Sequence, residues 1–387
     1  MSPCIHCDRG EVLELPGYGS FRRITSDCRP WDAGGRLGIC TFCATVQKPV
    51  TPAWLEECRR IYARYHAYHQ GQGAEQAVFL PGGAGQARSK AFLSWVFGRV
   101  PAAAAGRLLD VGCGNGNLLA SMSELFPGWR LAGADLGDGH RAEVEAIAHV
   151  EGFHNRGLED LPGGFDLVTA VHLLEHLDQP VRSLGALAAC LVPGGRLALE
   201  VPNLRSNPFD LLIADHASHF TPASLRRDLA AGGLRGAVHE DVIPRELSAL
   251  VQRQESADAP KEGRPDLAGA DADSLAATRT LVDHHLAWLL ELRTLARQRA
   301  DREGSVALLG SSIAAGWLAG ELDGRASCFV DEDPARTGGS FLGRPILTPS
   351  ELPKQASLLL PLTPATAGAV APRMAALGLD VVLPPPW

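Results

Sequence analysis

The chain of 387 residues lacks long apolar runs and an excess of basic residues. No stretch approaches the roughly 18 uninterrupted apolar residues of a membrane span, and the N-terminus lacks the charged and apolar regions of a signal peptide. Lys and Arg total 36 against 44 Asp and Glu, which gives a formal net charge of -8. A protein that binds the phosphate backbone of a nucleic acid needs a basic surface. We therefore expect a cytoplasmic protein with a small-molecule substrate and neither a nucleic acid nor a membrane as partner.

The missing export signal also decides how the nine cysteines are interpreted. Without export, they are reduced thiols or metal ligands and not a disulfide framework. Five of the nine lie in the first 43 residues, where two CxxC pairs each place two thiolates on one turn. His6 or Cys28 could replace one ligand, and free thiols without a metal are the competing interpretation. We expect residues 1–50 to bind a structural Zn²⁺ through Cys4, Cys7, Cys40 and Cys43.

Residues 51–87 are expected to form a mainly helical connector with a Gly-rich interruption. Pro52 suits a helix start, and apolar residues follow at steps of three and four. Three of the four tyrosines fall here beside two histidines. This group either lines a substrate pocket or packs the connector onto the next domain. Its members are Tyr62, Tyr65, His66, Tyr68 and His69.

Residues 88–252 carry the strongest chemical signal. The run 107–111, which includes Asp110, suits a buried parallel strand, and Gly-Cys-Gly-Asn-Gly at 112–116 follows before a helix. Glycines there let the main chain approach a ligand that a side chain would block. A second strand ends at Asp135, whose carboxylate is placed to accept hydrogen bonds from ribose hydroxyls. The pattern predicts a nucleoside-binding βαβ unit, for either NAD or S-adenosylmethionine.

At these residues the chain resembles the class I S-adenosylmethionine-dependent methyltransferases. Residues 108–116 are similar to the first motif of that family, and Asp135 matches its ribose-binding acid. Residues 158–162, 165–168 and 191–197 follow in the order of its adenine-flanking loop, its fourth strand and the turn into its fifth. The resemblance implies an α/β fold with a Rossmann-like core. It also implies S-adenosylmethionine bound by Asp110, Gly112, Gly114, Gly116, Asp135, Leu158 and Glu159.

The segment His172-Leu-Leu-Glu175-His176 spaces two histidines four residues apart, as zinc hydrolases also do. It follows the fourth predicted strand directly, where the methyltransferases that the chain resembles carry a similar helix start beside the cofactor. We therefore expect His172 near the methionine end of the cofactor, as an alternative proton acceptor. Glu175 and His176 are expected to make local hydrogen bonds and not to form a hydrolytic metal site.

The first candidates for acceptor chemistry follow the fifth predicted strand. Methyl transfer from a sulfonium requires alignment of the nucleophile and, for a hydroxyl or an acidic carbon, loss of a proton. Because an aspartate can orient an imidazole, Asp215 and His216 form the first candidate pair, with His219 as a competitor. A plain loop with exposed histidines is the structural alternative.

This segment and its flanks resemble the deoxysugar C-methyltransferases of antibiotic pathways. That family has a zinc module, a methyltransferase core and a C-terminal Rossmann-like domain, with a Glu-His pair where Asp215-His216 stands here. Asp replaces Glu, and Ile213 and Ala214 stand where that family has Tyr and His. The resemblance implies a sugar or nucleotide-linked sugar as acceptor, and these departures leave O- or N-methylation open beside C-methylation.

The C-terminal third is expected to hold a linker and long helix (253–303), then a second Rossmann-like domain (304–387). The domain is marked by a strand at 305–309, the turn Gly310-Ser311-Ser312 and a second strand that ends at Asp331. This domain either binds the nucleotide of the acceptor or only packs against the rest of the chain. Two other functions compete, a zinc-ribbon RNA methyltransferase, against which the net acidity counts, and a non-catalytic cofactor-binding module.

Overall fold

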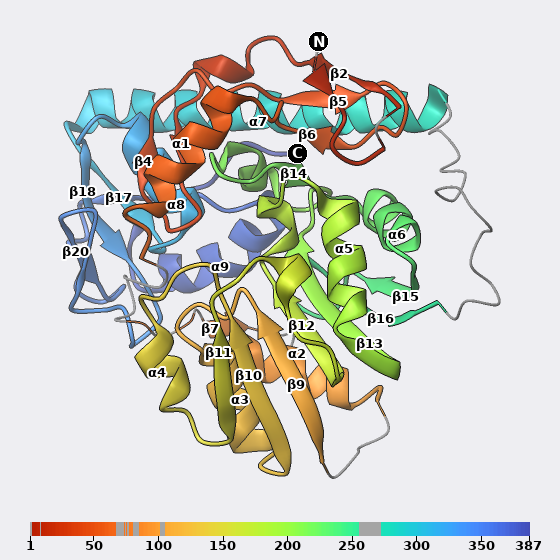
Figure 1. Ribbon diagram of the computed structural model, residues 1–387. Coiled ribbons are helices and arrows are strands. Elements are labelled where there is room, and N and C mark those ends of the chain that lie inside the picture. The colour runs from red at the N-terminus through yellow and green to blue at the C-terminus, as the bar shows by residue number, and fades with distance from the viewer. Residues whose placement is uncertain are drawn as a thin grey trace.

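The computed structural model describes residues 2–7, 9–66, 73, 75, 77–79, 85–100, 105–254 and 272–387. Tyr68, His69 and most of the predicted linker lie outside these residues. In Figure 1, the N-terminal part in red lies beside the long helix α7 (Ala272–Glu303), and the C-terminal sheet in blue lies at the left of the core.

A seven-stranded sheet forms the core, in the order β11-β10-β9-β12-β13-β16-β15. The strands from β11 to β13 are parallel, and β16 pairs antiparallel with both β13 and β15. The chain order reverses between β9 and β12, and open α/β sheets bind ligands at the carboxyl ends of the strands at such a point. The strands are β9 (Gly106–Val111), β10 (Trp129–Ala134), β11 (Val150–His154), β12 (Phe165–Val171), β13 (Leu191–Pro202), β15 (Leu234–His239) and β16 (Glu246–Arg253).

Helices cover both faces of this sheet, which is why its central strands are mostly apolar and buried. Successive strand residues point to opposite faces, so Leu108 and Leu109 belong to different clusters. Leu108 packs with α2 and α3, whereas Leu109 packs with α5 and α6. The helices are α2 (Arg88–Phe97), α3 (Asn117–Leu125), α4 (Arg141–Glu145), α5 (Pro180–Ala189) and α6 (Pro222–Ala231).

The N-terminal part shares a sheet with the core, in the order β1-β2-β5-β6-β14. Strand β14 (Ser218–His219) belongs to the segment after β13 and pairs antiparallel with β6 (Val46–Gln47). The other strands are β1 (Ser2–Pro3), β2 (Glu11–Glu14) and β5 (Gly38–Cys40), and a separate pair joins β3 (Arg23–Ile24) to β4 (Pro30–Trp31).

The connector is less helical than its periodicity predicts. Helix α1 (Pro52–Tyr62) begins where expected, and the Thr51 side chain caps it by accepting from the Trp54 amide at 3.2 Å. An antiparallel pair, β7 (Ala77–Phe79) and β8 (Gly85–Ala87), then precedes α2. The expectation of a mainly helical connector is therefore wrong for residues 77–79 and 85–87, which form an antiparallel pair of strands.

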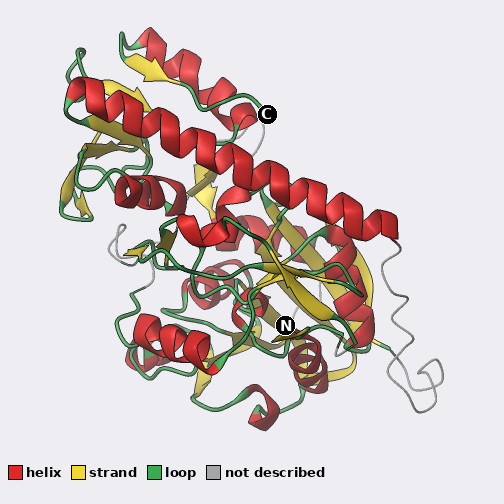
Figure 2. Ribbon diagram, turned by 90° about the horizontal axis from the view of Figure 1, so that it is seen from above, coloured by secondary structure: helices red, strands yellow, loops and turns green. Residues whose placement is uncertain are grey.

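The C-terminal part is a six-stranded sheet in the order β19-β20-β18-β17-β21-β22, parallel except for β19. The long helix expected within 253–303 is α7, which runs across the molecule in Figure 2. No helix in the described ranges is long and apolar enough to cross a membrane. The elements are β17 (Val306–Leu309), α8 (Ile313–Glu321), β18 (Ala326–Val330), β19 (Ser340–Phe341), β20 (Arg344–Leu347), β21 (Ser357–Leu359), α9 (Pro364–Ala376) and β22 (Asp380–Val382).

One apolar cluster joins the three parts. Ile24 of β3, Phe209 after β13, Trp288 of α7 and Trp317 of α8 are all buried in it. The Trp317 indole also donates to the Arg22 carbonyl at 3.0 Å. This shared core fixes the N-terminal and C-terminal parts against the segment that follows β13.

Candidate active site

The glycine loop lies at the carboxyl end of β9, where the strand order reverses. Gly112, Gly114 and Gly116 have φ values of 76°, 51° and 83°, in a region that favours glycine. A Cβ on Gly116 would lie 2.6 Å from Ile147 Cδ1, whereas a Cβ on Gly114 would meet nothing within 4 Å. The main chain at Gly114 therefore borders open space, as a nucleoside cofactor held against the backbone requires.

Asp135 closes the other side of this space, directly after β10. Its carboxylate accepts the amides of Gly114 at 3.1 Å and Gly137 at 3.0 Å. A carboxylate has about four lone-pair positions, so acceptor sites remain for two ribose hydroxyls. Leu136, the next residue along the chain, is 79% exposed.

Leu158 and Glu159 lie on a short 3₁₀ turn (Leu158–Asp160) after β11. Leu158 packs partly buried against the core, and Glu159 forms an ion pair with Arg182 of α5. Their proposed contact with the adenine thus involves one apolar side chain and one carboxylate that already has a partner.

Asp110 lies beneath the glycine loop and is 3% exposed. Its carboxylate accepts from the Thr169 hydroxyl at 2.7 Å. Burial disfavours the charged form and raises the pKa of Asp110 to about 7, although the Thr169 hydrogen bond opposes the change. Asp110 therefore supports the loop from below, while the ligand space lies above Gly114.

This raised pKa predicts a pH-dependent stability. Between its ordinary pKa of 3.8 and about 7, Asp110 is protonated in the folded chain and ionised in the unfolded one. The stability that the protonated Asp110 side chain contributes is therefore fully present below about pH 4 and is lost as the pH rises to about 7. Relative to Asp110→Asn, the free energy of unfolding of the wild type should fall by on the order of 4 kcal/mol over this range. Urea denaturation of both proteins at several pH values measures these free energies of unfolding. A wild-type-minus-variant difference that does not change with pH would contradict the raised pKa of Asp110.

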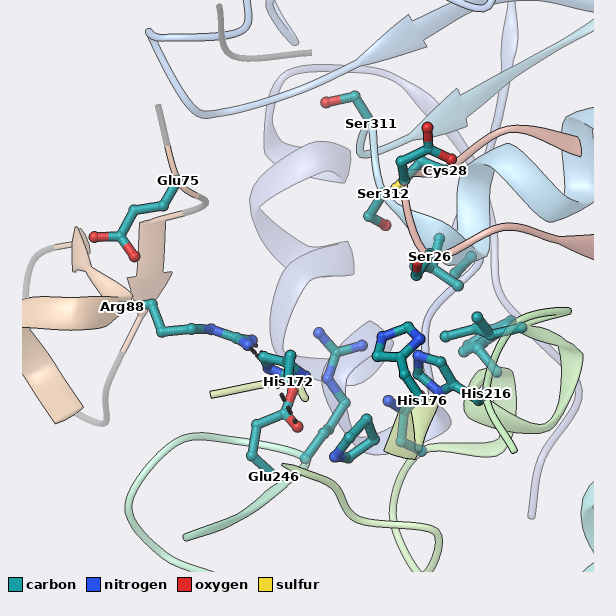
Figure 3. A pocket seen from close by; sticks show the side chains of 18 of the residues that line it. Ser26, Cys28, Glu75, Arg88, His172, His176, His216, Glu246, Ser311 and Ser312 are labelled. Carbon is teal, nitrogen blue, oxygen red and sulfur yellow. Dashed lines mark hydrogen bonds and ion pairs between the residues drawn. The ribbon is translucent and has the colours of Figure 1, made fainter. Parts of the chain in front are cut away.

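A cavity of about 230 Å³ is lined by all three parts of the chain. Ser26 comes from the N-terminal part, His176 and His216 from the core, and Ser312 from the C-terminal part. Figure 3 shows the rings of His176 and His216 next to each other, with Ser26 and Ser312 above them. No single domain could build this cavity alone.

His216 lines the cavity, but its carboxylate partner differs from the one expected. Its Nδ1 lies 2.7 Å from Oδ1 of Asp210. The expectation that Asp215 orients His216 is wrong, because Asp215 accepts from the Ser26 amide at 2.9 Å and the Ser26 hydroxyl at 2.5 Å. Adjacent residues in this extended segment point apart, so Asp215 turns toward the N-terminal part.

Asp210, which the sequence did not point to, contacts both His216 and His219. It lies on a 3₁₀ turn (Pro208–Leu212) and is 1% exposed. Its second oxygen lies 2.7 Å from Nδ1 of His219. Burial alone would raise the pKa of Asp210, but the His219 and His216 rings lower it well below its usual range. No sequence rule pairs a carboxylate with histidines six and nine residues later.

His219 differs from His216 in its surroundings. It is 1% exposed, and it is not among the residues that line the cavity. Burial lowers the pKa of His219 to about 4, although Asp210 opposes the change. The structure therefore brings His219 to the same aspartate as His216 but not to the cavity.

His172 lines the cavity within a polar network. Its Nδ1 lies 3.0 Å from Glu175, and Arg88 contacts its Nε2. Glu200 and Glu246 are 3.6 and 3.9 Å from Nε2. Because both ring nitrogens are engaged by protein groups, His172 has no free lone pair with which to accept a proton.

His176 was expected to make local hydrogen bonds, and the structure also places it in the cavity wall. Its Nδ1 lies 3.1 Å from the Asp215 carbonyl and 3.1 Å from the Tyr62 hydroxyl. Its ring is 4.6 Å from that of His216. Tyr65 also lines the cavity, so the described part of the aromatic group combines both interpretations, packing and pocket lining.

Comparison with known proteins agrees with this geometry. Residues 86–239 match a methyltransferase domain family. The chain is 32% identical over 179 residues to the ubiquinone biosynthesis O-methyltransferase of Xanthomonas oryzae pv. oryzae, covering 42% of this chain and 67% of that protein. This chain belongs to the class I S-adenosylmethionine-dependent methyltransferases.

Other relatives cover less of this methyltransferase. The protein syc1184_c of Synechococcus sp. is 35% identical over 113 residues, which is 27% of each chain. The chain thus spans about a quarter to two thirds of the length of these curated relatives. The structure of the mitomycin 7-O-methyltransferase MmcR aligns with a TM-score of 0.37 and 20% identity, over 43% of this chain and 53% of that one.

The methyltransferase also has four buried thiols in its N-terminal part, at Cys4, Cys7, Cys40 and Cys43. Cys4 Sγ lies 3.6 Å from Cys43 Sγ, and Cys7 Sγ lies 3.7 Å from Cys40 Sγ. A tetrahedron with Zn–S bonds of 2.3 Å has edges of about 3.8 Å, so the donor set fits zinc. The two alternative ligands point elsewhere, because His6 bonds Asp228 at 2.5 Å and Cys28 lines the cavity.

Proposed function

We propose that the chain transfers a methyl group from S-adenosylmethionine to a small sugar-type acceptor, with a nucleotide-linked sugar as the first candidate. The observation that carries this proposal is the cavity of about 230 Å³. His172 lines it, and the next residue, Leu173, lies 3.2 Å from the position of a Cβ on Gly112. We infer from this link that an acceptor in the cavity lies near a cofactor bound at the glycine loop.

His216 is the side chain that we expect to act on the acceptor. Asp210 accepts the Nδ1 proton, so Nε2 keeps its lone pair. The cofactor supplies an electrophilic methyl group, and the acceptor hydroxyl or carbon must lose a proton. We infer that His216 promotes this loss, with Asp210 holding the ring, and that Asp215 and His219 act only indirectly.

The C-terminal part supports a phosphate-bearing acceptor, and we infer that residues 304–387 form a second Rossmann-like domain. Gly310 has a φ of 84° in the turn after β17, and Ser312 precedes α8 without a side-chain cap. Ser312 and Ile313 line the cavity, and the first amides of a helix have no intrahelical partner. A nucleotide phosphate fits amides of this kind.

The methylated atom is oxygen or carbon in this proposal. The deoxysugar resemblance favours carbon, whereas the name of the Xanthomonas relative favours oxygen. The proposal also includes the rest of the domain division. It consists of a zinc-ribbon-like module at 1–50, a connector at 51–87, the cofactor-binding domain at 88–252 and a linker and helix at 253–303. A cytoplasmic location is part of the same proposal.

The cofactor assignment predicts that Asp135→Ala weakens the binding of S-adenosylhomocysteine at least about tenfold. Hydrogen bonds to a charged acceptor contribute about 1.5–3 kcal/mol, and the variant removes those made to the ribose. Isothermal titration calorimetry measures the affinity. Asp138→Ala is the matched control, since it removes the same charge from a side chain that pairs with Arg141 on the surface. Tight binding of NAD with none of S-adenosylhomocysteine would overturn the assignment.

A further inference from the structure

Two histidines and a glutamate converge at the cavity wall. One ligand atom each from Glu175, His176 and His216 lie within 4.8 Å of one another. Glu175 and His176 lie on a 3₁₀ turn (Leu174–His176) just after β12, and His216 follows β13. Two neighbouring strands of the sheet thus deliver three metal-ligand side chains to one place, and Figure 3 shows the two rings side by side.

Both histidines are fixed in the same tautomer. Nδ1 of His216 faces the Asp210 carboxylate at 2.7 Å, and Nδ1 of His176 faces the Asp215 carbonyl at 3.1 Å. Both of these partners only accept, and the Tyr62 hydroxyl at 3.1 Å from Nδ1 of His176 can accept as well. Each Nδ1 therefore carries a proton, and each Nε2 keeps a lone pair. Metal-binding histidines are held in this way, by a carboxylate or a backbone carbonyl on the distal nitrogen.

Glu175 completes the set. Its side chain is fully buried, and its Oε1 faces Nδ1 of His172 at 3.0 Å. Its Oε2 has no hydrogen-bond partner among the described residues. A buried carboxylate oxygen without a partner is costly. A ring nitrogen of His176 and one of His216 lie within 4.8 Å of a carboxylate oxygen of Glu175, so a cation between the three groups would balance the buried charge.

A neighbouring group of similar composition has a different explanation. Asp210, His216 and His219 also lie close enough to share an ion. Both Asp210 oxygens, however, already accept Nδ1 protons at 2.7 Å. That group is a hydrogen-bonded set in which the aspartate orients the two rings.

We propose that Glu175, His176 and His216 bind a divalent first-row transition-metal cation at the wall of the acceptor cavity. Two imidazoles and one carboxylate suit such ions and leave open coordination positions. A hydroxyl bound at an open position loses its proton more readily than a free hydroxyl. This role rests on the proposed function and deepens it, because His216 then promotes proton loss through the ion, whereas ion binding itself is independent of the acceptor.

Cobalt binding tests the proposal without an acceptor. Protein whose thiol site is filled with zinc is titrated with Co²⁺ by calorimetry and by visible absorption. We expect one Co²⁺ per chain, without the sulfur-to-cobalt charge-transfer absorption of a thiolate site. His176→Ala, His216→Ala and the isosteric Glu175→Gln should each weaken Co²⁺ binding at least about tenfold, and Asp210→Asn by about 10–100-fold through the His216 ring.

The matched control is His140→Ala, which removes a histidine from an exposed pair with Glu143. It should leave Co²⁺ binding unchanged. Each variant is first shown to bind S-adenosylhomocysteine, so that a misfolded protein is not counted. No Co²⁺ binding by the wild type, or equal binding by the wild type and the three ligand variants, overturns the metal site. S-adenosylhomocysteine binding in that case still leaves the proposed methyltransferase function standing, so the two failures are distinguishable.

Discussion

His216→Ala is expected to lower the rate of methyl transfer by about 10²–10⁴-fold, while the affinity for S-adenosylhomocysteine stays near that of the wild type. The ring lines the acceptor cavity, and Asp210 fixes its tautomer, so the substitution removes the one free lone pair that it offers. The glycine loop and Asp135 are not in contact with it. Transfer of a labelled methyl group to nucleotide-linked sugars measures the rate, and calorimetry measures the affinity.

Two neighbouring aspartates provide the matched comparison. Asp210→Asn should lower the turnover rate far more than Asp215→Asn, because of the two aspartates only Asp210 accepts a hydrogen bond from the His216 ring. An asparagine can present its amide N–H to Nδ1 and so favour the wrong tautomer, an effect of about 10⁴-fold where it has been measured in a histidine–aspartate pair. His219→Asn should cost less than His216→Ala. If His219→Asn abolishes turnover and His216→Ala retains it, the assignment moves to His219.

The cofactor half of the site could be predicted because its parts are close in sequence. The strand, glycine loop and helix at 107–122 are one local unit, and Asp135 ends the adjacent strand, so period and turn chemistry suffice. The acceptor half could not be predicted in this way. The partner of His216 depends on how a 3₁₀ turn folds back over the segment, and neighbouring residues such as Asp215 diverge to opposite sides.

The cavity forms only when the three parts of the chain pack together in the tertiary structure. Ser26 and Ser312 are separated by most of the chain, and they meet only because one apolar cluster joins β3, α7 and α8 to the segment after β13. Sequence patterns identify each part as a folding unit, yet they carry no information on how the units dock. Predicting domains therefore did not predict the site between them.

The N-terminal part also holds the backbone that carries His216. The Ile24 carbonyl accepts the Ala214 amide at 2.7 Å. Lys48, which is 1% exposed, donates from Nζ to the carbonyls of Ile213 and His216. Buried carbonyls need partners, so these donors fix the course of the segment. The segment that carries His216 is thus held partly by residues of the N-terminal part.

The thiol cluster is joined to this loop through His6. Its Nδ1 lies 2.5 Å from Asp228 of α6, and its Nε2 accepts from the Ser218 hydroxyl at 3.0 Å. Arg227 adds a hydrogen bond to the Cys43 carbonyl at 2.6 Å. Because His6 stands between two of the thiols, the order of the Cys4–Cys7 turn is transmitted to β14 and to the histidine segment.

Replacing Cys4 and Cys7 together with Ser is therefore expected to remove about one zinc per chain and, with it, most of the methyl transfer. Structural zinc sites contribute on the order of 10 kcal/mol or more to small modules, so the N-terminal part should lose its order. Loss of β6 and Lys48 then releases the segment that carries His216. S-adenosylhomocysteine should still bind, because the glycine loop and Asp135 belong to the core sheet.

Elemental analysis measures the zinc content, and amide hydrogen exchange should speed up over residues 1–50 and 213–219. Cys190→Ser, which alters a buried thiol at the end of α5 outside the four-thiol cluster, is the control. A metal-free double variant with protected amides in both segments would show that the thiols do not hold a structural ion.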